Sequence, residues 1–260
     1  MNPAMSSWVA LRQRVTFRAG QNVLILAATG SAGRMAIQIA KLLGANTVIG
    51  AGRGAARLAE LPALGATDTV LLEGEPDDIA RRLGNAAADV DIVIDYLWGE
   101  PTATAMLAIV MDRTDRANPL TWIEIGSVAG PTAAIPSAAL RAARLQIVGS
   151  GQGSVSTREI LAELPALAEQ ITNGALDIDA RPVPLADVEQ AWADSAATSQ
   201  RIVLVPNPRF QPHQAAGGAP RRGGGAAPGR GRGAARALCT ALTGERPTSR
   251  LLRPGGRRAR

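Results

Sequence analysis

Residues 23–45 read VLILAATGSAGRMAIQIAKLLGA, and this stretch decides the fold. The apolar run Val23–Ala27 is typical of a buried strand, and residues 32–43 carry apolar side chains at the spacing of a helix. The turn between them has the pattern A-x-G-x-x-G. A strand, a glycine turn and a helix in this order predict a dinucleotide-binding unit, because the N–H groups at the helix start bind phosphate.

The turn itself supplies the first candidate cofactor contacts. Gly30 lets the backbone approach a pyrophosphate closely, and Gly33 lets the helix pack tightly on the strand. The candidate contacts of the turn are Ala28, Thr29, Gly30, Ser31, Ala32 and Gly33. The alternative is an ordinary strand-to-helix turn that binds nothing, but the strand before the turn and the helix after it favour the binding turn.

The sequence that follows, up to about residue 172, alternates short β-branched runs with helical stretches, which predicts parallel βαβ units. The predicted strands after the first are Thr47–Ala51, Thr69–Leu72, Asp91–Asp95, Leu120–Ile125 and Leu145–Val148. The predicted helices are 55–63, 76–87, 100–112 and Thr157–Thr172, the last interrupted or kinked at Pro165. Six strands with intervening helices predict the α/β class, a doubly wound parallel sheet (Rossmann fold). Ile202–Val205 is predicted to be a lone strand.

The end of the second strand indicates which dinucleotide the turn binds. An NAD-binding domain carries an Asp or Glu there, which accepts hydrogen bonds from the ribose hydroxyls. Gly52 stands in that place and Arg53 follows it, so a ribose phosphate would meet an arginine instead of a carboxylate. The sequence therefore predicts NADP (NADPH), with Arg57 as a second contact. A solvated loop arginine is the alternative reading of Arg53.

The net charge of +6 is divided unevenly along the chain. Residues 1–208 hold 16 basic and 21 acidic residues, a net charge of −5, whereas residues 209–260 hold 12 arginines and one glutamate. The basic segment consists mainly of Gly, Ala, Pro and Arg without hydrophobic periodicity, which predicts a disordered tail over residues 207–260. Nucleic-acid binding through this tail is a weaker alternative, because Phe210 is the only aromatic residue after Trp192 that could stack on a base.

Residues 1–208 lack side chains that several classes of protein need, and this excludes those classes. Cys239 and His213 are the only cysteine and histidine, and both lie in the basic tail, so we expect no disulfide and no zinc site. The single lysine, Lys41, lies in the first predicted helix, which rules out a P-loop. The first residues are not typical of a signal peptide, and no apolar run is long enough to span a membrane, so a cytoplasmic location is expected.

Several separated segments resemble the zinc-free quinone oxidoreductase-like branch of the medium-chain dehydrogenase/reductase superfamily. They are AATGSAGRMAIQIAKLLGA at 27–45, LGATDTVLL at 64–72, VDIVIDYLWG at 90–99, PLADVEQAW at 184–192 and QRIVLVP at 200–206. The resemblance covers residues 2–206 and implies cofactor contacts beyond the turn. These are Gly52, Arg53, Tyr96, Leu97, Gly126, Ser127, Gly149, Ser150 and Gly151. For Tyr96, packing under a loop is an equally strong alternative.

The resemblance also implies a division of the chain into segments. Residues 1–175 correspond to the Rossmann dinucleotide-binding domain, and residues 176–206 to a C-terminal segment that completes the catalytic domain in the family. The family's amino-terminal GroES-like catalytic domain is missing from this sequence. Met5, Trp8 and Leu11 are predicted to form the apolar face of the helix that links the two domains, with part of that face exposed.

The activity implied by the resemblance is hydride transfer from NADPH to a quinone or an activated enone or carbonyl, without zinc. No catalytic residue is predicted, because the groups on the substrate side would come from the missing domain. The truncated chain is therefore expected to bind the cofactor without catalysing the reaction, and a non-catalytic nucleotide-binding remnant is the alternative function. The expected partners are the small-molecule substrate and a second copy joined through the sheet edge, with no membrane and no nucleic acid.

Overall fold

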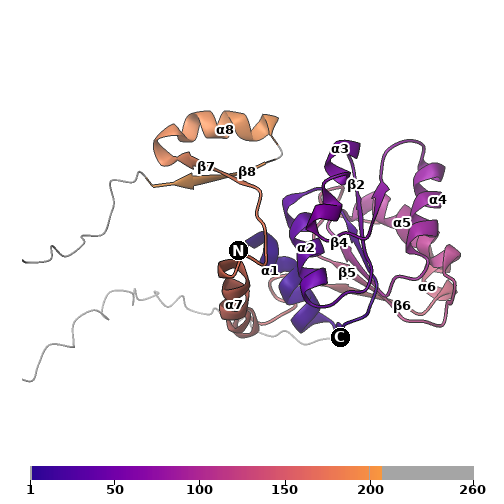
Figure 1. The fold of residues 1–260 in the computed structure, drawn as a ribbon. Coiled ribbons are helices and arrows are strands. Elements are labelled where there is room, and N and C mark those ends of the chain that lie inside the picture. Colours follow the sequence, from indigo (N-terminus) through magenta and orange to yellow (C-terminus); the bar gives the residue numbers. More distant parts are fainter. Residues whose placement is uncertain (1, 199, 207–260) are drawn as a thin grey trace, which may run out of the picture. The chain divides into compact units, whose positions relative to one another are not determined.

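Six parallel strands in the order β3-β2-β1-β4-β5-β6 form the central sheet (Figure 1). They are β1 Val23–Leu26, β2 Val48–Gly52, β3 Asp68–Leu71, β4 Ile92–Asp95, β5 Leu120–Glu124 and β6 Leu145–Gly149. The computed structural model describes residues 2–198 and 200–206, and the predicted tail over 207–260 lies outside them. The strand order reverses between β1 and β4, and folds of this kind bind ligands in the crevice at such a point, outside the carboxyl ends of the strands.

Helices cover both faces of this sheet (Figure 1). They are α1 Asn2–Val9, α2 Ser31–Leu42, α3 Ala55–Leu58, α4 Pro76–Ala87, α5 Gly99–Asp112, α6 Ser137–Ala142 and α7 Thr157–Thr172. A π-helical turn, Ala10–Arg14, follows α1, and a 3-10 turn, Leu61–Leu64, follows α3. The predicted doubly wound parallel sheet (Rossmann fold) is confirmed. None of the helices in the described part of the chain is long and apolar enough to cross a membrane.

The apolar run of β1 is explained by burial on both faces. Val23 and Ile25 belong to the cluster that includes residues of α1, α2 and α7, whereas Leu24 and Leu26 belong to the cluster with α4 and α5. All four side chains are fully buried. Each contributes about 1.5 to 3 kcal/mol of hydrophobic stabilisation, and the strand therefore fixes the centre of the sheet.

The first helix packs more closely than the sequence predicted. Trp8 is 3% exposed and Leu11 is 2% exposed, and Met5 is partly buried against the same core. The predicted exposure of this face is therefore confined to Met5, because Trp8 and Leu11 are buried. The reason is that α1 packs against both α2 and α7, which the linear pattern did not bring together.

Glu163 of α7 joins these helices by polar contacts. Its carboxylate accepts hydrogen bonds from Trp8 Nε1 and Arg12 Nε, each at 2.7 Å, and from Gln13 Nε2. Burial raises the pKa of Glu163, but the hydrogen bonds from Gln13, Arg12 and Trp8 outweigh it and hold that pKa below its ordinary value. The charged carboxylate is therefore the form that stabilises this contact between α1 and α7.

Glu163→Gln should lower the free energy of unfolding at pH 7 by about 1.5 to 3 kcal/mol, the usual cost of losing hydrogen bonds to a charged group. Because the pKa of Glu163 is lower in the folded state, its contribution is present above about pH 4.3 and is lost as the pH falls towards the lowered value. Urea unfolding between pH 3 and 7 should show a shallower acid loss for the variant than for the wild type. Glu169→Gln, an exposed change on the same helix, is the control and should match the wild type.

A second, two-stranded sheet follows α7. β7, Ala180–Pro184, pairs in parallel with β8, Arg201–Val205, and a 3-10 turn, Leu185–Asp187, leads into α8, Val188–Ala197, between them. The prediction that Ile202–Val205 is a lone strand is therefore wrong. Pro182 and Pro184 concealed its partner, because proline lacks the N–H that a central strand needs and is confined to strand edges.

Two helix predictions also change in detail. α7 continues through Pro165 without a break, because this residue is exposed and the carbonyl that it leaves unpaired can be hydrated. The helix predicted over 55–63 is instead the short α3 followed by the 3-10 turn at Leu61–Leu64. Pro62 lies at the start of that turn, where its fixed φ and missing N–H are tolerated.

Candidate functional site

The glycine turn joins the end of β1 to the start of α2. Ala27, the first residue after β1, has a left-handed backbone with a φ of 62°, and Gly30 is the N-cap of α2. The N–H groups of the first helical turn, which begins at Ser31, lack acceptors within the helix and are directed out of its N-terminus. Together with the helix dipole they form a site suited to a phosphate group.

The two glycines of the turn have different surroundings. A Cβ atom at Gly33 would lie 2.3 Å from the carbonyl oxygen of Ala27 and 2.6 Å from the Cα of Ala28, so only glycine fits between α2 and the turn. At Gly30 the nearest atom to a Cβ would be the Ala27 oxygen at 3.5 Å, an ordinary contact. Gly33 is therefore required by packing, while Gly30 is exposed and leaves its backbone open to a ligand.

The end of β2 lies directly against the turn. A Cβ atom at Gly52 would lie 2.8 Å from Cγ2 and 2.9 Å from Oγ1 of Thr29. This close approach leaves no room for the carboxylate side chain that an NAD-binding domain carries at this position. Arg53 is exposed and Arg57 is half-buried, so both guanidinium groups are at the surface of this edge.

Glu73 brings a carboxylate close to the same edge, and sequence reasoning missed it. It lies after β3, and its Oε1 accepts a hydrogen bond from the N–H of Gly54 at 2.9 Å. The contact joins residues 19 positions apart, and only the pairing of β2 with β3 brings them together. A negative charge therefore lies next to the residue that follows Arg53.

A cavity of about 640 Å³ opens beside the turn. Among the predicted contacts, Thr29, Ser31 and Arg57 line it. Arg34 of α2 and Arg201 of β8 line the same cavity and were not predicted. Three arginines from separate elements thus share one cavity with the phosphate turn.

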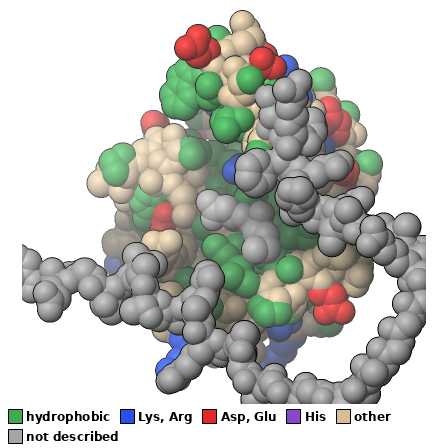
Figure 2. All heavy atoms as spheres, turned by 90° about the vertical axis from the view of Figure 1, so that its left-hand side faces the viewer, with side chains coloured by type: hydrophobic (Ala, Val, Ile, Leu, Met, Phe, Trp, Pro, Cys, Tyr) green, Lys and Arg blue, Asp and Glu red, His purple; other side chains and the backbone are tan. Residues whose placement is uncertain are grey.

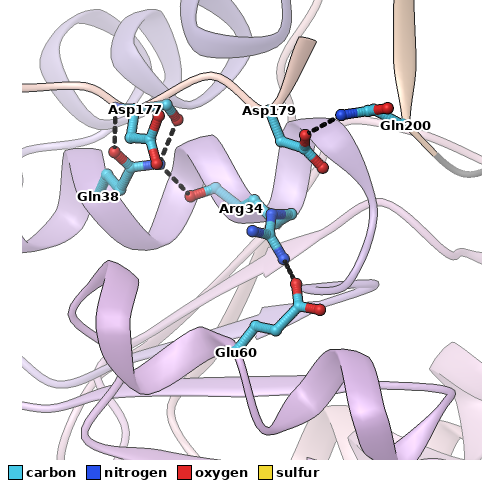
Figure 3. Close-up of polar contacts among 6 residues, drawn as sticks. All are labelled: Arg34, Gln38, Glu60, Asp177, Asp179 and Gln200. Atoms are coloured by element: carbon cyan, nitrogen blue, oxygen red, sulfur yellow. Dashed lines mark hydrogen bonds and ion pairs between the residues drawn. The ribbon is translucent and has the colours of Figure 1, made fainter. Parts of the chain in front are cut away.

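The wall of this cavity is held by polar contacts, shown in Figure 3. Arg34 Nη1 donates to Glu60 Oε2 at 2.7 Å. Gln38 Nε2 donates to the carbonyl oxygen of Asp177 at 2.9 Å, and its Oε1 accepts from the N–H of Asp177 at 2.6 Å. These two bonds fasten the chain leading to β7 onto α2, which brings Asp177 and Asp179 into the cavity wall.

Asp95 supports the neighbouring turn, at the end of β4. Its carboxylate is fully buried and accepts four hydrogen bonds. Oδ1 accepts from the N–H groups of Leu97 and Trp98 at 2.8 and 3.1 Å, and Oδ2 accepts from Thr102 Oγ1 and Trp122 Nε1 at 2.7 and 2.9 Å. The turn contains a strained residue, because Trp98 has a φ of 51° and a ψ of −164°.

Tyr96 lies beneath this edge and not on it. The residue is 7% exposed, and its hydroxyl lies 3.0 Å from Ser6 Oγ. Burial raises the pKa of Tyr96, although hydrogen bonds with Ser6 and Ser7 act in the opposite direction. The side chain therefore packs against α1, and Leu97, half-buried after it, is the more accessible of the two predicted contacts.

The other predicted contacts lie at the carboxyl end of β6 or directly after β5 and β6, at the same edge of the sheet. Ser127, Gly149 and Gly151 are exposed, and Gly126 is half-buried. Ser150 is buried, and its N–H donates to the carbonyl of Glu124 at 2.8 Å. None of these residues lines the cavity that Thr29 and Ser31 line. The predicted contacts therefore form two groups, one in that cavity and one at the carboxyl ends of β5 and β6.

A family model described as zinc-binding dehydrogenase matches residues 32–169. The chain belongs to this family. The probable NADPH-dependent quinone reductase tdiC of Emericella nidulans is 30% identical over 217 residues, which are 79% of this chain and 60% of that protein. The chain thus spans about three-fifths of the length of this relative, and the predicted membership of the quinone oxidoreductase-like branch, for the cofactor-binding part, is confirmed.

Solved structures of quinone oxidoreductases share the fold. The enzyme of Pseudomonas syringae pv. Tomato DC3000 has 24% sequence identity and a TM-score of 0.63, covering 79% of this chain and 63% of that one. The Escherichia coli enzyme, complexed with NADPH, has 22% identity and a TM-score of 0.62 over 79% of this chain and 63% of its own.

The zinc in the family's name does not fit the residues present here. Residues 1–208 contain neither cysteine nor histidine. Within the described residues, no group of three or more His, Cys, Asp or Glu side chains could hold a metal ion. Structural and catalytic zinc sites use three or four ligands, drawn mainly from cysteine and histidine.

Proposed function

We propose that this member of the zinc-binding dehydrogenase family binds NADPH along the carboxyl ends of its strands. The observation that carries the proposal is the pair of close approaches at Gly33 and Gly52. The first seats the start of α2 on the turn, so that its N–H groups can hold the pyrophosphate. The second disfavours a carboxylate side chain at residue 52, and Arg53 beside it can instead donate to a ribose phosphate.

The reaction that we propose for the whole protein is hydride transfer to a quinone or an activated enone or carbonyl. The nicotinamide ring would supply the hydride, and the protein would orient the ring and exclude water. Support comes from tdiC, a probable NADPH-dependent quinone reductase. The residues described here would hold the cofactor by its pyrophosphate and ribose, and no residue of this chain is assigned to the acceptor.

The cofactor preference can be tested directly. A fluorescence titration should give a lower dissociation constant for NADPH than for NADH. Arg53→Ala should weaken NADPH binding by about 1 to 3 kcal/mol, the cost of losing a charged hydrogen bond, and should leave NADH binding unchanged. Equal affinities for the two cofactors, before and after the substitution, would refute the NADPH assignment.

Glu73→Gln is the complementary variant. Its carboxylate lies beside Gly54 and would repel a ribose phosphate bound by Arg53. Neutralising it should strengthen NADPH binding and change NADH binding little. If Glu73→Gln instead weakens NADH binding alone, Glu73 itself accepts hydrogen bonds from the ribose, and the site prefers NADH.

Residues 176–206 are proposed, from the same resemblance, to complete a second domain. β7 and β8 form a two-stranded sheet, and such a sheet is marginally stable alone. Large apolar side chains on this segment are exposed, with Trp192 at 81% and Leu185 at 52%. Figure 2 shows hydrophobic side chains at the upper end of the molecule in that view. The exposed apolar side chains of this segment would be covered by the domain that β7 and β8 complete.

A homodimer through the sheet edge is a further part of the proposal, together with a cytoplasmic location. β6 is the last strand of the central sheet, so its outer edge can pair with a strand of a second copy. Sedimentation of the full chain would give a mass near twice 26.8 kDa if the edge is used.

A further inference from the structure

A second cavity, of about 810 Å³, lies at the end of the sheet opposite the phosphate turn. Ile92, Thr121 and Gln146 line it, and they belong to the first residues of β4, β5 and β6. The phosphate turn, by contrast, follows the carboxyl end of β1. The volume lies in the range of about 300 to 1,000 Å³ that small-molecule sites occupy.

The charged residues that line this cavity are all basic. Arg12, Arg14 and Arg18 line it, and none of the described lining residues is acidic. Arg12 is paired with Glu163 through its Nε, but Arg14 Nε donates only to the uncharged carbonyl of Gly149 at 2.7 Å. The Arg18 guanidinium makes no hydrogen bond or ion pair with another described residue and is exposed. Arg14 and Arg18 therefore line the cavity, and neither forms an ion pair with another described residue.

Apolar side chains lie next to these charges. Leu11 and Ile92 line the cavity from the buried core, each 2% exposed. Val15, Phe17 and Leu43 also line it and pack against the same core while partly exposed. A ligand that contacts the arginines can therefore also cover apolar surface.

The loop that carries Arg18 is held in place by hydrogen bonds. The N–H of Arg18 donates to Gln21 Oε1 at 2.8 Å, and the N–H of Gln21 donates back to the carbonyl of Arg18 at 3.2 Å. The N–H of Gly20 donates to the carbonyl of Gly44 at 2.7 Å, which fastens the loop to the end of α2. A wall fixed in this way needs little ordering when a ligand binds, and this favours affinity.

We propose that this cavity binds a small organic oxyanion, a phosphate or carboxylate that carries a compact apolar group. The guanidinium groups of Arg14 and Arg18 hold the oxyanion, since arginine presents a planar set of donors that matches such groups. The apolar group lies on Val15, Phe17 and Leu43. The lining residues of this site differ from the residues proposed to hold NADPH, and one bond links the two sets, from Arg14 to the carbonyl of Gly149.

The test measures binding of 1-naphthyl phosphate and 1-naphthoate to the full chain by calorimetry. Both probes should bind, with inorganic phosphate and 1-naphthol binding at least about tenfold more weakly, because each lacks one of the two contacts. Arg18→Gln should weaken probe binding about tenfold or more, as expected for a lost charged hydrogen bond. Because the Arg18 side chain bonds no other described residue, the variant should unfold at the wild-type urea concentration.

Arg53→Gln is the matched control, an exposed arginine at the opposite end of the sheet, and it should leave probe binding unchanged. Loss of binding in Arg53→Gln with retention in Arg18→Gln would place the probe in the proposed NADPH site and overturn the inference. Retention of binding in both variants would overturn it as well. A glutamate-rich octapeptide that binds more tightly than the naphthyl probes, and depends on Arg18, would identify a protein partner and also reject a small-molecule site.

Discussion

Gly33→Ala should destabilise the chain by about 3 kcal/mol or more, at the upper end of the effects of overpacking. The added methyl group would lie 2.3 Å from the oxygen of Ala27 and 2.6 Å from the Cα of Ala28. Both are backbone atoms, so the overlap can be relieved only if α2 moves away from β1. Urea unfolding followed by circular dichroism would show the loss as a lower midpoint with a similar slope.

Gly30→Val is the matched control, three residues away in the same turn. A Cβ there would meet no atom closer than 3.5 Å, and the backbone, with a φ of −81° and a ψ of 164°, suits a branched residue. We expect a midpoint close to that of the wild type but no NADPH binding, because the side chain blocks the approach of the pyrophosphate. Equal midpoints for the two variants would show that the turn does not pack on α2 as described.

The sequence predicted the central fold because its signals are local. A fully buried strand, a glycine turn and an amphipathic helix lie within residues 23–45, and their order alone indicates a βαβ unit. The C-terminal part was predicted less well, since the prolines in β7 hide a strand whose partner, β8, lies about twenty residues later. α6, only six residues long, was missed because so short a helix has no measurable period.

The candidate site shows the same division between local and distant signals. Thr29 and Ser31 are predicted from the turn, and both line the cavity. Arg201 lines it too, but about 170 residues separate it from the turn, and nothing in its own sequence context indicates a cavity. Glu73 was likewise missed, because its contact with Gly54 exists only where neighbouring strands end together.

Asp95 is the position at which the largest effect outside the glycine turn is expected. Its role could not be read from the sequence, where it is simply the last residue of a strand. In the fold it is fully buried and satisfies two backbone N–H groups, the hydroxyl of Thr102 and the indole N–H of Trp122. Among these four donors only the hydroxyl can also accept a hydrogen bond.

Asp95→Asn keeps the shape of the side chain and replaces one acceptor oxygen by an NH₂ group. Whichever way the amide is turned, that group faces at least one donor that cannot accept, so a buried N–H loses its partner. We expect the free energy of unfolding to fall by about 3 kcal/mol or more, because one N–H is left unsatisfied and the remaining charged hydrogen bonds become weaker neutral ones. Because the turn at Leu97 and Trp98 is strained, it should also open more readily, which hydrogen exchange at these two amides would detect.

Two controls separate this network from general effects of charge. Asp89→Asn removes an exposed carboxylate three residues before β4 begins, and its free energy of unfolding should lie within about 0.5 kcal/mol of that of the wild type. Thr102→Val removes only one of the four donors and should cost about 1 to 2 kcal/mol. If Asp95→Asn unfolds at the same urea concentration as Asp89→Asn, and hydrogen exchange at the amides of Leu97 and Trp98 is unchanged, then the carboxylate does not hold this turn. A large loss for Asp95→Asn with an intermediate loss for Thr102→Val follows only if the four donors share one buried acceptor.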